Sequence, residues 1–242
     1  MAAQVDLDRA AGAVRELLDA LGVDCGSEEL AATPRRVAET YAEFLRGVRT
    51  DPATALSETV AEAGAVGDVV LLRDIEFRSV CAHHLLPFQG VAHIAYLPSE
   101  RIVGLSALPK VVAAFAARPQ MQERLGEEIA ETLNAGLQPR GVLVVLEARH
   151  GCLADRNLSQ SGTGVANIAA RGAFCEPARR QETMSLLRPT PRGSDGSCTA
   201  ARAEAATQAD VATQAEATTQ AGAASLAEMV AAASHRESEV HQ

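Results

Sequence analysis

Two short clusters of cysteine and histidine stand out in this chain. It has five cysteines and six histidines, and Cys81, His83 and His84 fall within four positions of the stretch "SVCAHHLLPF". A second pair, His150 and Cys152, ends the apolar stretch "VLVVLEARHGC". Thiolates and imidazoles are the ligands that zinc favours in proteins. The alternative is an ordinary strand end, with a buried cysteine and two partly exposed histidines.

The spacing divides these five residues into two groups. A structural zinc takes four protein ligands, whereas a catalytic zinc takes three and leaves one position for water. Cys81 and His84 flank a two-residue gap that a turn can close on one metal, and Cys152 is the third candidate ligand. Neighbours on an extended strand point to opposite sides, so His83 and His84 are expected to differ in role. His83 and His150 remain as candidate proton carriers, because imidazole titrates near neutral pH.

The elements that must position these residues follow from periodicity. The pattern of residues 141–152 predicts a strand that presents His150 and Cys152 on one face, shared with Val144, Leu146 and Ala148. Helices are predicted over 5–21 and from 33 to 48, the second with Thr33 as its N-cap. Strands are predicted over 68–77 and 90–98, two helices over 105–137 with a break at Pro119, and a last ordered segment over 163–174.

Composition limits the possible functions. The 242 residues are 47% hydrophobic but only 3% aromatic, so aliphatic side chains and alanine must fill the core. The net charge of −9 argues against a general nucleic-acid binder. We find no signal peptide and no apolar run long enough for a membrane span, so we expect a cytoplasmic protein. In that compartment the cysteines are expected to be free thiols or metal ligands.

The composition changes after about residue 192. Residues 193–242 repeat Thr-Gln-Ala at Thr207, Thr213 and Thr219 and contain no aromatic residue. Such a segment buries too little apolar surface to offset its ordering entropy, so we predict a disordered or weakly helical tail. A partner-docking helix near 225–233 is the alternative. The predicted organisation is an N-terminal helical region (1–60), a catalytic domain (61–192) and this tail.

Over residues 5–190, and most closely over 76–174, the sequence resembles the GTP cyclohydrolase I family. The matching segments are "TPRR", "CAHHLLPFQGVAHIAYLP", "VGLS", "RPQMQERL", "EARHGC" and "RGAF". The resemblance implies an α+β tunnelling fold, in which an antiparallel sheet carries two helices on one face and follows N-terminal helices. It also implies a homo-oligomer, a decamer, whose sheets join into a barrel and whose active sites lie between subunits.

The resemblance also implies a role for each matching residue. Cys81, His84 and Cys152 match the zinc ligands, and His83 and His150 match the catalytic histidines. Glu123 matches the glutamate that holds the guanine ring. The other matching substrate-binding residues are Gln122, Ser106 and the basic residues Arg36, Lys110 and Arg156, which match positions assigned to the triphosphate. The implied reaction opens the imidazole ring of GTP at C8, releases formate and forms 7,8-dihydroneopterin triphosphate.

The chain departs from the family pattern mainly near the phosphates. Ala82 replaces a glutamate, Ala107 replaces a lysine, Lys110 replaces an arginine and Asp155 begins "DRN" in place of "M-R-G". Downstream, "GTGVANI" replaces a Ser/Thr-rich run. A paralog that acts on a guanine compound with fewer phosphates is therefore one alternative. A non-catalytic homologue that binds a purine or pterin is another, although the retained metal, proton-carrier and guanine positions favour catalysis.

Overall fold

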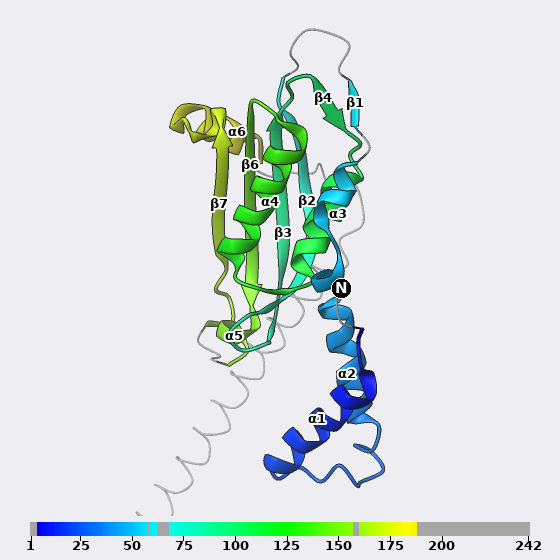
Figure 1. The fold of residues 1–242 in the computed structure, drawn as a ribbon. Coiled ribbons are helices and arrows are strands. Elements are labelled where there is room, and N and C mark those ends of the chain that lie inside the picture. Colours follow the sequence, from blue (N-terminus) through cyan, green and yellow to red (C-terminus); the bar gives the residue numbers. More distant parts are fainter. Residues whose placement is uncertain (1–3, 58, 62–67, 157–159, 188–242) are drawn as a thin grey trace, which may run out of the picture. The chain divides into compact units, whose positions relative to one another are not determined.

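The centre of the molecule is one mostly antiparallel five-stranded sheet. A computed structural model describes residues 4–57, 59–61, 68–156 and 160–187 (Figure 1). The strand order is β5-β2-β3-β6-β7. The strands of this sheet are β2 (Val70–Cys81), β3 (Pro87–Leu97), β5 (Pro119–Gln120), β6 (Gly141–His150) and β7 (Val165–Gly172). A separate ribbon pairs β1 (Thr59–Ala61) with β4 (Arg101–Val103).

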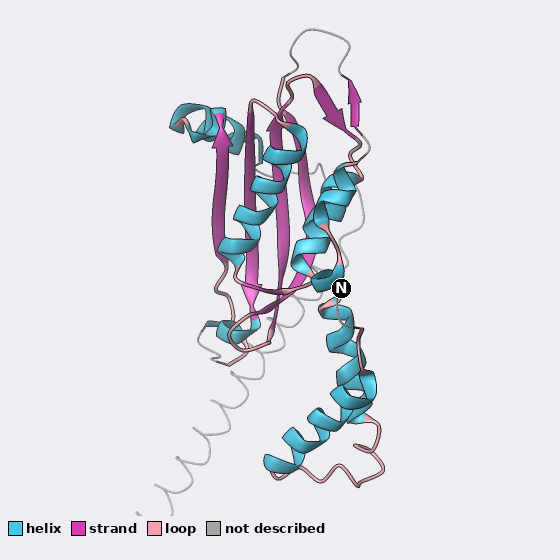
Figure 2. Cartoon of the chain, in the orientation of Figure 1, coloured by secondary structure: helices cyan, strands magenta, loops and turns pink. Residues whose placement is uncertain are grey.

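Two long helices cover one face of this sheet (Figure 2). They are α3 (Ala107–Ala116) and α4 (Gln122–Leu137). The remaining helices are α1 (Leu7–Ala20), α2 (Thr33–Phe44), α5 (Gly151–Ala154) and α6 (Pro177–Leu187), with 3₁₀ turns at Arg46–Arg49, Pro52–Leu56 and Ala173–Cys175. The α+β class and the two helices on one sheet face are as the sequence predicts.

The alternation of apolar residues along β3 and β6 decides which face carries the helices. Ala92 and Ile94 of β3 pack in the main core with residues of β6, α3 and α4. The alternate residues of the two strands point the other way, where Ala95 of β3 and Leu143 of β6 form a smaller cluster with Phe174. Each fully buried aliphatic side chain contributes about 1.5–3 kcal/mol. An aliphatic core of this size supports the sheet without tryptophan.

The start of α2 differs from the sequence prediction. Ala32 is the N-cap, and no side chain caps the helix, so the prediction of Thr33 as N-cap is wrong by one residue. The helix also ends at Phe44 rather than near residue 48, and Arg46–Arg49 forms a 3₁₀ turn. Gly47 lies in this turn and passes so close to α3 that a Cβ there would lie 2.2 Å from the Ala114 carbonyl oxygen. Only glycine fits at this point of the chain.

Several elements were not predicted from the sequence. They are the β1–β4 ribbon, the short parallel strand β5 beside β2, and α6. None of the four cysteines in the described ranges is in a disulfide, and the alternatives of free thiol and metal ligand both remain. None of the described helices has the length and apolar character needed to cross a membrane. The predicted tail lies outside the described residues, and the predicted domain boundaries stay predictions.

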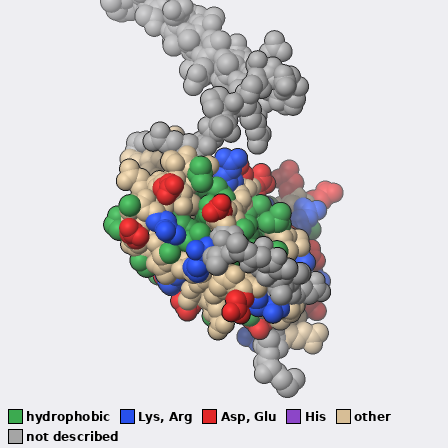
Figure 3. Space-filling model, turned by 90° about the horizontal axis from the view of Figure 1, so that it is seen from above, with side chains coloured by type: hydrophobic (Ala, Val, Ile, Leu, Met, Phe, Trp, Pro, Cys, Tyr) green, Lys and Arg blue, Asp and Glu red, His purple; other side chains and the backbone are tan. Residues whose placement is uncertain are grey.

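The end of the molecule that is seen from above in Figure 3 carries charges of both signs. On this face the acidic and basic side chains of the described residues are interspersed rather than gathered by sign (Figure 3). A nucleic-acid-binding surface would instead show a continuous basic patch.

Candidate metal centre and its surroundings

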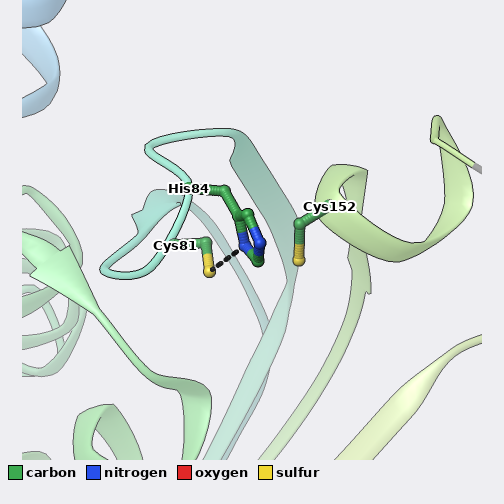
Figure 4. Close-up of side chains that lie close together, drawn as sticks. All are labelled: Cys81, His84 and Cys152. Carbon is green, nitrogen blue, oxygen red and sulfur yellow. Dashed lines mark hydrogen bonds between the residues drawn. The ribbon is translucent and has the colours of Figure 1, made fainter.

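Three side chains from distant parts of the chain converge at one end of the sheet. Cys81 ends β2, His84 lies in the turn before β3, and Cys152 lies in α5. Their ligand atoms all lie within 4.8 Å of one another. In Figure 4 the His84 ring lies between the two sulfur atoms, and its Nδ1 is 3.9 Å from Cys81 Sγ.

This donor set fits a zinc ion. Zn–S distances of about 2.3 Å and Zn–N distances of about 2.0–2.1 Å put tetrahedral ligand atoms roughly 3.5–3.8 Å apart. The Cys81–His84 separation of 3.9 Å is close to that range. Two thiols and one imidazole match a three-ligand zinc site, which keeps one position open for water or substrate. The arrangement therefore resembles a catalytic zinc site more than a structural one.

The loop that carries His84 is tied down by its own backbone. Cys81 N–H donates to Leu86 O and Leu85 N–H donates to Cys81 O, both at 2.8 Å. Ala82 N–H donates to the Gln120 carbonyl of β5, also at 2.8 Å. These bonds hold the segment that carries His84 between its flanking strands.

Leu85 has an unusual backbone conformation for a leucine. Its φ is 55°, in the left-handed region, which costs a non-glycine residue about 1–2 kcal/mol. Its carbonyl accepts a hydrogen bond from the Tyr41 hydroxyl of α2 at 3.0 Å. Sequence reasoning missed Tyr41, because the two residues are 44 positions apart and no local pattern relates them.

The end of β6 corrects the sequence prediction for the second cluster. The strand ends at His150, and residues 151–154 turn into α5, so His150 and Cys152 do not share a strand face. The turn at Gly151 is tight: a Cβ there would lie 2.8 Å from Pro87 O and 2.7 Å from Asp155 Oδ2. The helical turn directs Cys152 toward Cys81 and His84, and these three residues are called the metal cluster. His150 stays on the face of β6 that points to the core.

His150 lies between an aromatic ring and a buried amide. Its ring stacks on Phe88 with centroids 4.5 Å apart and an interplanar angle of 4°. Its Nε2 lies 2.7 Å from Gln122 Oε1. Burial lowers the pKa of His150, while the negative charge of Glu123 acts in the opposite direction. The imidazole is thereby held in one orientation and favoured in its neutral form.

Gln122 is buried and fully engaged within the protein. Its side-chain amide donates to Leu146 O and to Val165 O, both at 3.0 Å. Since both hydrogens of the amide nitrogen are used, Oε1 must face His150, which therefore donates from Nε2. The family resemblance implied that Gln122 binds substrate, which stays a prediction; its side chain contacts His150 and joins α4 to β6 and β7.

We expect Gln122→Leu to lower the free energy of unfolding by about 1–3 kcal/mol, because it leaves buried carbonyls without a donor. Gln89→Leu is the matched control, since Gln89 is exposed on β3 and exposed substitutions usually change stability by about 0.5 kcal/mol or less. Urea denaturation of both variants measures the difference. Equal stabilities would show that the Gln122 bonds are not needed.

The remaining residues near the metal cluster are on its exposed side. His83 is exposed, with its ring centroid 6.3 Å from that of His84. Burial raises the pKa of the Cys152 thiol and the Cys81 thiol adds to this, whereas the charge of Arg156 acts against both. Arg156 is therefore close enough to influence the site electrostatically.

Asp155 is not a free negative charge beside Arg156. Its Oδ1 accepts a hydrogen bond from Arg149 Nη2 at 2.6 Å. The pair is partly exposed, so its contribution to stability is small. Its effect on the local charge is larger, because Arg149 offsets much of the repulsion that Asp155 would exert on an anion.

The structure does not bring every predicted substrate residue to this place. The chain that follows the end of α3 lies beside the loop that carries His84, since Pro119 of β5 pairs with Val80. Ser106, the N-cap of α3, and Lys110, in the first half of this helix, are both exposed. At 1.5 Å per residue they lie about 15 Å and about 9 Å from the end of α3 next to the cluster, so both lie away from the cluster within one chain. Ala107, where the resemblance pointed to a lost lysine, is 6% exposed and packs in the core. Arg36 is exposed on α2.

The family profile and the similar proteins of known name all indicate one family. The GTP cyclohydrolase I family profile matches residues 10–188. GTP cyclohydrolase 1 of Leifsonia xyli is 50% identical over 182 residues, which cover 75% of this chain and 95% of that protein. The enzymes named GTP cyclohydrolase 1 from Rhodopirellula baltica and Streptomyces griseus are each 46% identical, over 76% and 75% of this chain and 80% and 90% of their own lengths.

A solved structure of archaeosine synthase QueF-Like in the apo form covers 44% of this chain and 96% of its own, with 20% identity and a TM-score of 0.38. That likeness is too low to carry an argument. The family match spans α1 to the end of α6 and includes both cysteine–histidine clusters. With relatives at 46–50% identity over three quarters of its length, this chain belongs to the GTP cyclohydrolase I family.

Proposed function

We propose that this protein hydrolyses GTP, opening the imidazole ring at C8 and forming formate and 7,8-dihydroneopterin triphosphate. The observation that carries the proposal is the convergence of Cys81, His84 and Cys152 within 4.8 Å of one another. His150, held by a buried glutamine, lies two residues from Cys152 along the chain. The name of the relatives supplies the substrate class, GTP.

Each residue has a distinct part in this proposal. Cys81, His84 and Cys152 would hold a zinc ion, which would supply Lewis-acid chemistry and a water made nucleophilic near neutral pH. His150 and His83 move the protons that ring opening and formate release require. His150 is suited to this because its Nε2–H faces Gln122, which leaves Nδ1 as the atom that can exchange a proton.

Glu123 is proposed to read the guanine ring. It is exposed in the first turn of α4, next to Gln122, and its charge acts on His150. A carboxylate facing the exocyclic amine and the adjacent ring N–H of guanine makes two charge-assisted hydrogen bonds.

The net reaction consumes one water molecule. Two water molecules are added at C8, and one leaves when the new ring closes.

A second copy of the chain is proposed to complete the site. Ser106 and Lys110 match substrate positions, but they lie about 15 Å and about 9 Å along α3 from the helix end that is next to the His84 loop of their own chain. A site at a junction between subunits can take these residues from a neighbour. This supports the homo-oligomer that the resemblance implies, with a decamer as the expected assembly. A cytoplasmic location stays a prediction.

The charges near the cluster favour a triphosphate over a substrate with fewer phosphates. Arg156 acts on Cys152, and the negative charge of Asp155 is offset by Arg149. The repulsion between Asp155 and a phosphate group, which suggested a substrate with fewer phosphates, is thereby reduced. The retained metal ligands and the buried Gln122–His150 pair also favour an enzyme over a homologue that only binds a purine or pterin.

The direct test is to incubate the zinc-loaded full-length protein with GTP, GDP, GMP and guanosine. Formate and pterin fluorescence are measured for each compound. We expect GTP to have the highest kcat/KM and to give one formate per pterin. Faster turnover of GMP or guanosine would support the fewer-phosphate alternative, and the absence of formate from all four would refute a catalytic function.

We expect Glu123→Gln to lower kcat/KM for GTP by roughly 10- to 150-fold, because it weakens charge-assisted hydrogen bonds of about 1.5–3 kcal/mol. Glu127→Gln, one helical turn further along α4, is the control: its carboxylate pairs with Arg171 instead. Steady-state kinetics of both variants measure the effect. If Glu123→Gln behaves like Glu127→Gln, Glu123 does not contact the substrate.

A further inference from the structure

We infer that Tyr41 of α2 is a positioning residue for the metal centre, acting through the backbone of the loop that carries His84. This inference rests on the proposed metal site. The Tyr41 hydroxyl donates to Leu85 O at 3.0 Å, and Leu85 directly follows the ligand His84. The contact therefore joins an N-terminal helix to the backbone beside a metal ligand.

The conformation of Leu85 explains why such a contact is needed. A leucine at φ 55° is held in a backbone region that its side chain disfavours. The bond from Leu85 N–H to Cys81 O fixes one side of this residue. The bond from Tyr41 fixes its carbonyl, on the other side. Together the two bonds hold Leu85, and with it the preceding peptide and the His84 side chain.

The surrounding packing allows α2 to act on this loop. His84 and Leu85 line a cavity of about 620 Å³ with apolar residues of α1 and α2, among them Leu17 and Val37. Tyr41 lines the same cavity and is partly buried, and its ring also meets the edge of Phe44. Because the tyrosine ring is held by these neighbours, its hydroxyl is presented to Leu85 in a defined place.

Removal of the Tyr41 hydroxyl should therefore lower the affinity of the site for zinc. Groups that orient a metal ligand without touching the metal typically change affinity by about 10- to 100-fold when they are removed. We expect Tyr41→Phe to weaken zinc binding about 10-fold and to lower kcat at limiting zinc, with KM for GTP nearly unchanged. Saturating zinc should restore most of the activity, because the ligands themselves are intact.

The experiment measures zinc affinity of the full-length protein by competition with a chromogenic chelator. Thr40→Val is the matched control: it removes a hydroxyl from the same helix, one that bonds Arg36 O rather than the loop. A zinc affinity of Tyr41→Phe within 2-fold of wild type, or an equal loss in Thr40→Val, would overturn the inference. Thermal melting of both variants checks that each is folded.

A second variant tests the route through the backbone. Asparagine tolerates the left-handed conformation better than leucine does. In a Leu85→Asn background, Tyr41→Phe is expected to weaken zinc binding less than about 3-fold, against about 10-fold with leucine present. An unchanged 10-fold effect would show that Tyr41 does not act through Leu85 and would overturn the inference.

The outcomes separate this inference from the proposed function. If wild type binds zinc and Cys152→Ala does not, the metal site stands, and only Tyr41→Phe decides the positioning role. If wild type itself binds no zinc, the metal site and the role of Tyr41 both fail.

Discussion

The substitution Cys152→Ala is expected to remove zinc from the protein and to lower the turnover of GTP by at least about 1,000-fold. Cys152 supplies one of the three candidate ligand atoms, which lie within 4.8 Å of one another. With two protein ligands left, the site no longer matches a zinc site of three or four. A metal that activates water and polarises the substrate contributes several kcal/mol, and each 1.36 kcal/mol corresponds to a factor of ten in rate.

The measurement is zinc per chain by elemental analysis, together with formate release. Cys175→Ala is the control, because Cys175 is exposed and its thiol lies 3.7 Å from Ala170 O, away from the cluster. We expect the control to keep about one zinc per chain. Full metal occupancy in Cys152→Ala would refute the ligand assignment.

The substitution His150→Ala is expected to slow proton transfer without removing the metal. The His150 ring is stacked on Phe88 and bonded to Gln122, and it is outside the group of three ligand atoms. His150→Ala should therefore keep its zinc while kcat falls by about 100- to 10,000-fold, the usual contribution of a general acid or base. KM should change much less than kcat.

His93→Gln is the comparison for this variant. His93 lies on the neighbouring strand β3, and its Nδ1 accepts a hydrogen bond from Asp74 N–H at 3.2 Å. It pairs with Val145, which packs on the sheet face opposite α3 and α4. We expect His93→Gln to affect stability more than kcat. A His150→Ala enzyme with kcat within 10-fold of wild type would remove His150 from the reaction, and added imidazole should partly restore its rate if the assignment is correct.

Much of the fold could be predicted from local patterns. The two-residue alternation of β3 and the apolar run of β6 predict strands, since side chains on a strand alternate between faces. The break at Pro119 predicts the end of the first helix over 105–137, and α3 does end at Ala116. These patterns were sufficient because each depends on residues within a few positions of one another.

The elements that the sequence did not predict depend on distant contacts. The strand β5 is two residues long and exists because it pairs with the end of β2, about 39 positions earlier. In the 3₁₀ turn after α2, Gly47 lies against α3. No pattern within either segment specifies its distant neighbour.

For the candidate site, the sequence by itself was enough to propose which three side chains converge. The spacing of Cys81 and His84, and the chemistry of thiol and imidazole, were enough to select the three ligand candidates that the fold brings together. Only the tertiary structure decided how they meet. The helical turn after Gly151 separates Cys152 from His150, the buried Gln122 occupies the Nε2 side of His150, and Tyr41 reaches the carbonyl of Leu85. Each of these depends on a close contact between segments far apart in the chain, and such contacts form only when the whole core packs.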